Sequence, residues 1–265
     1  MIEQVAILGF GNMGEALVRG LRERQPRIGV SVLEKREERR ERARELGATV
    51  FDSAAFDAFM ATSDTVVLSI KPQDLSAIAT RGGSPFAAKQ VISVLAGTSL
   101  ETLRQRLGTD SVARLMPSLT AQIGRAVVGV AFADDVPQEL RRNALAIAAV
   151  IGSAHEVPEQ MMAAVTGLSG SGVAYVFAFI HALALGGTRA GIPYPQSLEI
   201  AREVTAGAAD FLAAGGEHPV SALTRVTSPA GTTIEGIAAL ERNGFSAAVI
   251  EAVAAAVTRA IELER

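Results

Sequence analysis

The stretch that decides the fold is Val5-Ala6-Ile7-Leu8-Gly9-Phe10-Gly11-Asn12-Met13-Gly14. A short apolar run, typical of a buried strand, leads directly into glycines spaced Gly-x-Gly-x-x-Gly, and a helical pattern begins at Glu15. In this context Gly9 permits a tight turn, Gly11 lets a pyrophosphate approach the backbone, and Gly14 lets helix and strand pack closely. The stretch therefore predicts a dinucleotide site formed by Gly9, Phe10, Gly11, Asn12, Met13 and Gly14. The alternative is a glycine-rich turn that binds nothing.

Short apolar strands alternate with helical patterns through the first part of the chain. After the first strand, we expect strands at Ser31–Leu33, Thr65–Ile70, Val91–Leu95 and Val112–Leu115. Strands separated by helices imply right-handed crossovers and a parallel, doubly wound sheet. Beyond Pro158 no strand pattern remains, and helical periodicity continues almost to the end. We therefore predict an α/β chain, with an N-terminal doubly wound Rossmann domain at residues 1–158 and an all-α C-terminal domain at residues 159–265.

Composition excludes several classes of protein. Of the 265 residues, 49% are hydrophobic and 20% charged, so the chain is globular rather than disordered. A net charge of −3 gives no electrostatic reason to bind nucleic acid, and the absence of cysteine excludes disulfides and thiol catalysis. The most apolar stretch, Leu168–Thr188, is expected to be a buried helix rather than a membrane span, and the three histidines lack metal-site spacing. We expect a cytoplasmic protein with no metal and no nucleic-acid or membrane partner.

The residues after the second strand give conflicting signals about the cofactor. Glu34 follows Gly14 by 20 residues, where an acid hydrogen-bonds the adenosine 2′-hydroxyl of NADH and repels the 2′-phosphate of NADPH. Lys35 and Arg36 follow immediately and have the charge to bind that phosphate. They could equally begin a solvated helix, because the run that ends at Glu45 mixes charges of both signs. We expect Glu34, Lys35 and Arg36 to lie at the cofactor and leave the choice between NADH and NADPH open.

A second informative stretch, Thr227–Glu241, is typical of a turn that ends at the start of a helix. Pro229 and Gly231 mark the turn, and apolar residues then recur at helical spacing. Thr232 and Glu235 fit a capping box, in which each side chain accepts a hydrogen bond from the other residue's backbone N–H. Free N–H groups at a helix start favour a bound anion, and a carboxylate is the natural one. The alternative is a capped helix that binds nothing.

Several motifs together resemble the pyrroline-5-carboxylate reductase family. The run Ser228-Pro229-Ala230-Gly231-Thr232-Thr233-Ile234 is similar to its signature S-P-G-G-T-T-I. Lys71-Pro72 matches its K-P after a strand, and Ser93–Gly97 matches its S-x-x-A-G. The resemblance covers essentially the whole chain. It implies an oxidoreductase that reduces the cyclic imine 1-pyrroline-5-carboxylate to L-proline with NADPH or NADH, the last step of proline biosynthesis.

The resemblance also implies roles for particular residues and a mode of assembly. Further cofactor-binding residues would be Ile70, Lys71, Pro72, Ala96 and Gly97. Substrate-binding residues would be Ser228, Gly231, Thr232 and Thr233. Of these, Thr233 would be the catalytic hydroxyl that faces the ring nitrogen. Members of the family pair through the C-terminal domain, and the helices after Gly172 carry apolar faces nearly all round that a partner must cover. We therefore expect a homo-oligomer, either a dimer or an assembly of dimers.

The chain departs from the family pattern at several motif positions. Ser118-Leu119-Thr120 stands where the family has N-T-P, Val173 replaces a proline, His181 replaces a glutamate, and Ala230 replaces the first glycine of the signature. These departures leave open a reductase of a related cyclic imine, or a nicotinamide-binding paralogue with little turnover. Hydroxyacid dehydrogenases, which carry a catalytic lysine in a second domain, are disfavoured because no lysine follows Lys89.

Overall fold

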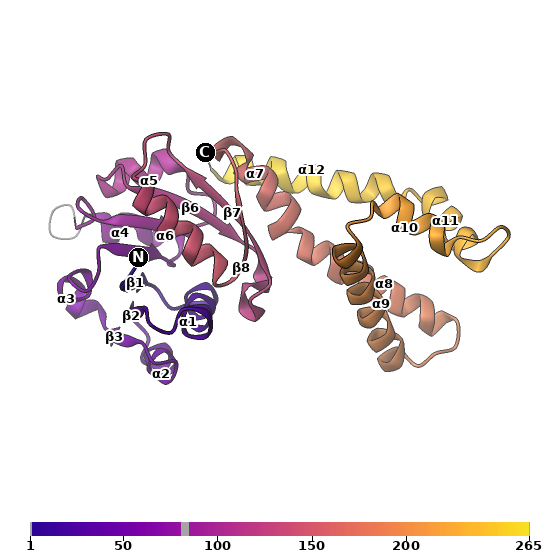
Figure 1. Ribbon diagram of the computed structural model, residues 1–265, viewed down its shortest axis with the longest axis horizontal. Helices are drawn as coiled ribbons and strands as arrows, with labels where there is room; N and C mark the ends of the chain where they lie inside the picture. The colour runs from indigo at the N-terminus through magenta and orange to yellow at the C-terminus, as the bar shows by residue number, and fades with distance from the viewer. Residues whose placement is uncertain (1, 81–84, 265) are drawn as a thin grey trace. The chain divides into compact units, whose positions relative to one another are not determined.

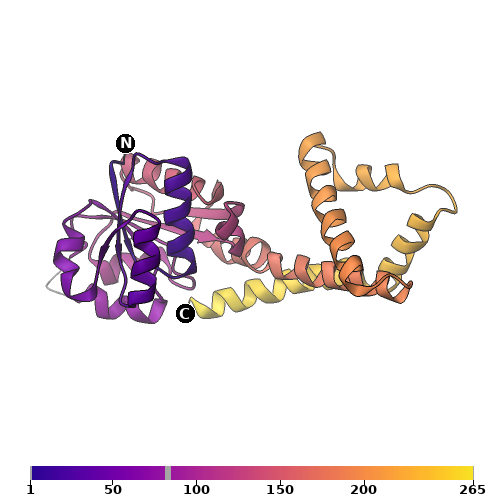
Figure 2. The same cartoon turned by 90° about the horizontal axis from the view of Figure 1, so that it is seen from below.

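The structure is a computed structural model that describes residues 2–80 and 85–264. The chain divides into two compact units, which we call the sheet unit (Met1–Ser171 with Ala256–Arg265) and the helical unit (Gly172–Ala255). All strands lie in the sheet unit, and the described residues after Glu156 form only helices and turns (Figure 1, Figure 2). The predicted fold class, an α/β Rossmann domain followed by an all-α domain, is confirmed. The boundary after residue 158 remains a prediction.

The sheet has eight strands in the order β3-β2-β1-β4-β5-β6-β7-β8. They are β1 (Gln4–Leu8), β2 (Gly29–Leu33), β3 (Thr49–Phe51), β4 (Thr65–Leu68), β5 (Gln90–Ser93), β6 (Val112–Pro117), β7 (Ala126–Phe132) and β8 (Gly152–Glu156). All five predicted strands are present. These five strands run parallel, as predicted, whereas β7, which was not predicted, runs antiparallel to β6. The strand order reverses between β1 and β4, which is where open α/β sheets bind ligands.

Helices cover both faces of the sheet. The helices of the sheet unit are α1 (Asn12–Arg24), α2 (Glu37–Glu45), α3 (Phe56–Met60), α4 (Leu75–Ala79), α5 (Leu100–Leu107), α6 (Gln138–Ala149) and α7 (Met162–Val165). Alternate residues of a strand point to opposite faces, so Val5 and Ile7 join one core with residues of α1 and α6. Ala6 and Leu8 join the opposite core with residues of α3, α4 and α5. The central strands are therefore apolar on both faces, as in a covered parallel sheet.

A buried arginine in the sheet unit binds the last turn of the chain. Arg114, in β6, is 1% exposed and pairs with two carboxylates. Its Nη1 lies 2.9 Å from Oε1 of Glu159, and its Nη2 binds Glu264, which follows the last helix. The same turn packs beside Gly97, where an added Cβ would lie 3.2 Å from the carbonyl oxygen of Leu263. Such partners are needed because an unpaired buried charge is strongly destabilising.

The helical unit has almost no core of its own. Its helices are α8 (Gly172–Arg189), α9 (Tyr194–Gly215), α10 (Pro219–Val226), α11 (Thr232–Arg242) and α12 (Phe245–Leu263), whose end belongs to the sheet unit. The buried residues of this unit are Ala184, Ser197 and Ala201. In contrast, Phe177, Phe211 and other large apolar side chains are half exposed or more. Helices with such apolar surfaces need cover from outside the unit.

The most apolar helical stretch differs from its prediction. We expected a buried helix at Leu168–Thr188, but within one chain α8 buries only Ala184. By length and composition, the longer stretch Glu159–Arg189 is the one helix among the described residues that passes as a possible membrane span. The prediction of burial is therefore wrong for the single chain, because most residues of α8 stay accessible to solvent among the residues that the structure describes.

Candidate active site

Of the three motif glycines, only Gly11 has open space beside its backbone where a ligand could approach. Gly9 has φ +96°, which side chains disfavour, and a Cβ there would lie 2.4 Å from the carbonyl oxygen of Ser69. A Cβ on Gly14 would lie 2.4 Å from the carbonyl oxygen of Gly9, so the first turn of α1 packs directly on the loop. A Cβ on Gly11 would meet no atom within 4 Å. Gly11 thus faces open space at the start of α1, where free N–H groups favour a phosphate.

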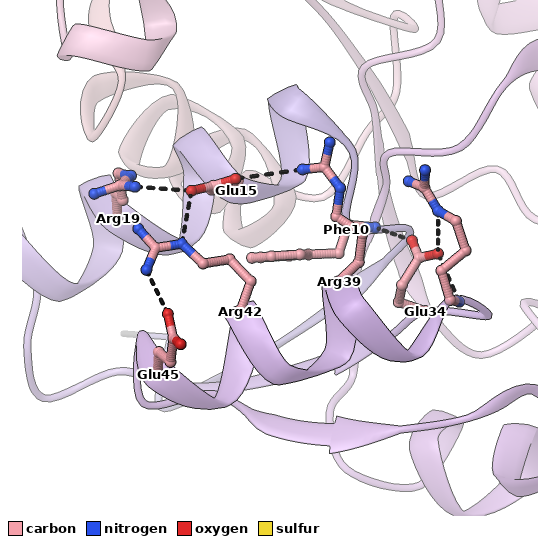
Figure 3. Close-up of polar contacts among 8 residues, drawn as sticks. Phe10, Glu15, Arg19, Glu34, Arg39, Arg42 and Glu45 are labelled. Atoms are coloured by element: carbon pink, nitrogen blue, oxygen red, sulfur yellow. Dashed lines mark hydrogen bonds and ion pairs between the residues drawn. The ribbon is translucent and has the colours of Figure 1, made fainter.

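Glu34 closes this loop from the end of β2 (Figure 3). Its buried carboxylate accepts the N–H of Phe10 on Oε2 at 3.0 Å, and the N–H and Nε of Arg36 on Oε1 at 3.0 and 3.2 Å. Burial raises the pKa of Glu34, but the hydrogen bonds from Phe10 and Arg36 outweigh it and hold the pKa below its ordinary value of 4.5. The carboxylate is therefore ionised at neutral pH and held in one position.

A second carboxylate, Glu15, ties α1 to α2 beside the loop. It pairs with Arg19 at 2.8 Å, Arg42 at 3.2 Å and Arg39 at 3.4 Å, and Figure 3 shows the three side chains around it. Burial raises the pKa of Glu15, but the hydrogen bonds from Arg19 and Arg42 lower it by more than burial raises it. The pKa therefore lies below its ordinary value of 4.5. This network holds the helix that follows Glu34 against the helix that follows the glycine loop.

These elements surround a pocket of about 790 Å³ at the carboxyl ends of the central strands. That volume is in the range of small-molecule and cofactor sites. The predicted cofactor residues that line it are Gly9, Phe10, Gly11, Asn12, Met13, Glu34, Lys35, Arg36, Ile70 and Lys71. The predicted residues outside its lining are Gly14, Pro72, Ala96 and Gly97. Gly14 packs beneath the loop and Gly97 faces the last turn of the chain, so both serve close packing in this structure.

Half of the pocket lining was not predicted. The additional residues are Leu8, Leu33, Ser53, Phe56, Ser69, Gln73, Asp74, Ala77, Ile78 and Val94. Leu8 and Leu33 end their strands and Ser69 directly follows one, so the rule that ligands bind at carboxyl ends of strands points to them. Ser53 and Phe56 follow β3, a strand that no sequence pattern indicated. Phe56 and Ile78 add apolar side chains to the pocket lining.

In the helical unit, the predicted substrate residues lie together: Ser228 and Gly231 are in the turn before α11, and Thr232 and Thr233 are its first two residues. The N–H of Gly231 donates to the carbonyl of Ser228 at 3.0 Å, and a Cβ on Gly231 would lie 2.3 Å from Oγ of Ser228. Helix α11 begins at Thr232 with Gly231 as its N-cap, and no side chain caps it. The predicted capping box of Thr232 and Glu235 is therefore wrong, because the helix starts one residue too early for it. The N–H groups of the first turn have no side-chain cap.

The departures from the family motifs have identifiable environments. Ala230 has φ +54°, a left-handed conformation that costs alanine roughly 1–2 kcal/mol, and it stands where the signature has glycine. Ser118 is buried, and its Oγ accepts the N–H of Val127 at 3.1 Å. His181, on α8, lies with Nδ1 3.0 Å from the hydroxyl of Tyr194 on α9. Val173 lies in the first turn of α8.

Two family models match separate parts of the chain. Residues 159–263 match the model described as pyrroline-5-carboxylate reductase dimerisation. Residues 4–97 match the model described as NADP oxidoreductase, coenzyme F420-dependent. The first match includes the helices whose apolar surfaces are exposed in one chain, and the second includes the glycine loop and Glu34.

Individual relatives match the chain over most of its length. Pyrroline-5-carboxylate reductase from Aquifex aeolicus is 34% identical over 251 residues, which cover 94% of this chain and 93% of the relative. The enzyme of that name from Synechocystis is 40% identical over 201 residues, which cover 76% and 75% of the two chains. The crystal structure of 1-pyrroline-5-carboxylate reductase from Streptococcus pyogenes is 31% identical, with a TM-score of 0.84 and 97% of each chain covered. The predicted resemblance is confirmed, and the chain belongs to the pyrroline-5-carboxylate reductase family.

Proposed function

We propose that this protein is a pyrroline-5-carboxylate reductase, which reduces 1-pyrroline-5-carboxylate to L-proline with NADH or NADPH. The observation that carries the proposal is the pocket at the carboxyl ends of the strands, with open space over Gly11. It occurs in a chain that relatives bearing this activity in their names match over 94% of its length.

The residues present fit a nicotinamide dinucleotide. Gly11 leaves room for a pyrophosphate at the start of α1, Glu34 offers an acceptor for a ribose hydroxyl, and Phe56 and Ile78 offer an apolar wall for the adenine. When bound, the reduced nicotinamide supplies a hydride to the imine carbon, and the C=N electron pair moves to the nitrogen. The proposed cofactor residues are Gly9, Phe10, Gly11, Asn12, Met13, Gly14, Glu34, Lys35, Arg36, Ile70, Lys71, Pro72, Ala96 and Gly97.

The proposed substrate residues lie at the start of α11. Ser228, Gly231 and Thr232 bind the carboxylate, supported by first-turn N–H groups that no side chain caps. Thr233 places its hydroxyl at the imine nitrogen, where it accepts the N–H of the protonated imine. Because a protonated imine is already an electrophile, the protein has only to orient it, and orientation can supply much of the rate.

We further propose that the chain forms a dimer, or an assembly of dimers, through its helical part. The half-exposed apolar side chains of α8, α9 and α12 and the match to a dimerisation model support this assignment. The domain division at residue 158 belongs to the same proposal, since the dimerisation match begins at residue 159. We also propose that the protein is cytoplasmic.

The test is a kinetic assay of the purified protein that follows oxidation of the reduced cofactor. With 1-pyrroline-5-carboxylate we expect saturable turnover and L-proline as the product. With 1-pyrroline, which has the same ring imine but no carboxylate, kcat/KM should fall at least about tenfold, the effect of losing one charge-assisted contact. No turnover with either imine would refute the proposal, and equal kcat/KM for both would refute the carboxylate role of Ser228, Gly231 and Thr232.

A further inference from the structure

The carboxylate of Glu34 lies in the pocket lining and is held in place by three hydrogen bonds. The residue is 6% exposed and lines the pocket. A carboxylate offers about four acceptor positions, and three are filled by N–H groups of Phe10 and Arg36. Among the described residues, Oε2 accepts only the N–H of Phe10, so it keeps one acceptor position for a further donor. A ribose 2′-hydroxyl is such a donor, whereas a 2′-phosphate is not.

The arginines of α2 have the charge to bind a phosphate, but the structure pairs them with other groups. Arg39 and Arg42 bind Glu15, and Arg42 also binds Glu45. Arg40 binds Glu37 and donates to the carbonyls of Glu34 and Lys35 at 3.0 and 2.9 Å. Arg44 binds Glu37 at 3.0 Å. None of the four lines the pocket.

Three basic residues line the pocket: Lys35, Arg36 and Lys71. Lys71 follows β4, which β1 separates from β2, so Lys35 and Arg36 are the two beside Glu34, and they compensate its charge only in part. Arg36 directs its Nε to Glu34, so its charge is already paired, and its side chain is 58% exposed. Lys35 is exposed, and a solvated ammonium attracts a phosphate weakly. A 2′-phosphate with a charge of about −1.5 to −2 would instead meet the buried, ionised Glu34. Repulsion is stronger there than at the surface because the side chain is shielded from water.

We propose that Glu34 makes this reductase selective for NADH over NADPH. This inference deepens the proposed function, since it rests on the pocket being the site of a nicotinamide cofactor. The proposed preference for NADH differs from the cofactor named by the family model that matches residues 4–97, which is NADP. The sequence of Glu34, Lys35 and Arg36 left the choice between the two cofactors open. In the structure this choice is assigned to the Glu34 carboxylate, which three hydrogen bonds hold in place.

The experiment measures binding of each reduced cofactor by calorimetric titration without any imine, so it does not depend on turnover. We expect the native protein to bind NADH at least about tenfold more tightly than NADPH, a difference of about 1.4 kcal/mol. Glu34→Gln keeps an amide oxygen for the N–H of Phe10 but removes the charge, and it should reduce the NADH:NADPH affinity ratio at least about tenfold. Glu37→Gln is the matched control, because Glu37 pairs with Arg40 and Arg44 outside the pocket. Its affinity ratio should equal that of the native protein.

The outcomes separate this inference from the proposed function. Binding of NADPH as tightly as NADH by the native protein would overturn the inference and leave the reductase assignment intact. An unchanged affinity ratio in Glu34→Gln, with native-like circular dichroism, would do the same. If neither cofactor binds, the proposed function fails and the inference fails with it. If Glu34→Gln does not fold, the comparison of NADH and NADPH binding by the native protein still tests the inference.

Discussion

Gly11 and Gly14 belong to the same glycine motif, one as the N-cap of α1 and the other in its first turn, yet replacing each by alanine should have opposite consequences. At Gly14 the new Cβ would lie 2.4 Å from the carbonyl oxygen of Gly9. That oxygen cannot retreat freely, because the N–H of Gly9 binds the carbonyl of Leu33 at 2.9 Å, and the Ser69 backbone lies so close that a Cβ on Gly9 would be 2.4 Å from its carbonyl oxygen. At Gly11, which has the ordinary φ of −79°, the Cβ would meet nothing.

The magnitudes follow from these contacts. Overpacking against backbone costs up to about 3 kcal/mol, and alanine inside α1 recovers about 1 kcal/mol of helix propensity. The free energy of unfolding of Gly14→Ala should therefore fall by about 2 kcal/mol, which lowers Tm by roughly 4–8 °C for a chain of this size. Gly11 is the N-cap of α1, where alanine costs at most about 1 kcal/mol relative to glycine. Its Cβ would instead occupy the space proposed for the pyrophosphate.

The assay combines thermal unfolding by circular dichroism with calorimetric titration of NADH. We expect Gly14→Ala to melt early, and Gly11→Ala to melt close to the native protein but bind NADH at least about tenfold more weakly, a loss of about 1.4 kcal/mol. The reasoning would be refuted if Gly14→Ala melted with the native protein, or if Gly11→Ala bound NADH with native affinity.

Three further predictions concern other parts of the molecule. Thr233→Ala should lower turnover at least about tenfold, or about 1.4 kcal/mol in the transition state, while Thr233→Ser keeps most of it; unchanged turnover in Thr233→Ala would remove this hydroxyl from the mechanism. Because the folded-state pKa of Glu15 is lowered, its stabilisation is present above pH 4.5 and is lost as the pH falls through the folded pKa. Unfolding titrations should therefore show Glu15→Gln less stable than the native protein at pH 7 but converging with it in acid, and a gap that stays constant would contradict the network. Light scattering at micromolar concentration should give at least twice the chain mass, whereas 27.6 kDa would show a monomer.

The parts of the fold that the sequence predicted are those in which local pattern and tertiary role agree. The strand before Gly9 is apolar on both faces because it is covered on both, and the glycine spacing reflects contacts seen in the structure. In the three strands that were not predicted, β3, β7 and β8, local pattern and tertiary role do not agree in this way. β3 has three residues and begins at the exposed Thr49, and β8 is a half-exposed edge strand that contains His155 and Glu156. β7 contains Gly129, whose missing side chain makes room for Val165, a contact that local pattern does not reveal.

The site shows the same division. The position of Glu34 at the pocket was predicted from its spacing after Gly14. The directions of the arginines of α2 could not be predicted, because in the sequence they could equally have turned toward the pocket. Their actual direction depends on Glu15 and Glu37, which lie on two different helices. The capping box failed for a related reason, since Gly231 packs against Ser228 and starts the helix one residue early.

The pairing of Arg114 with Glu264 has a consequence for how the chain is made. Arg114 leaves the ribosome 150 residues before Glu264, an interval of about 8–30 s at bacterial-to-eukaryotic synthesis rates of roughly 5–20 residues per second. Glu159 is synthesised within that interval, and until Glu264 follows it is the only one of the two carboxylate partners that is available to Arg114. The strands of the sheet are complete by Glu156, but the surface beside Gly97 stays uncovered until Leu263 emerges. The nucleotide-binding half of this enzyme therefore reaches its final form only after translation of the entire helical unit.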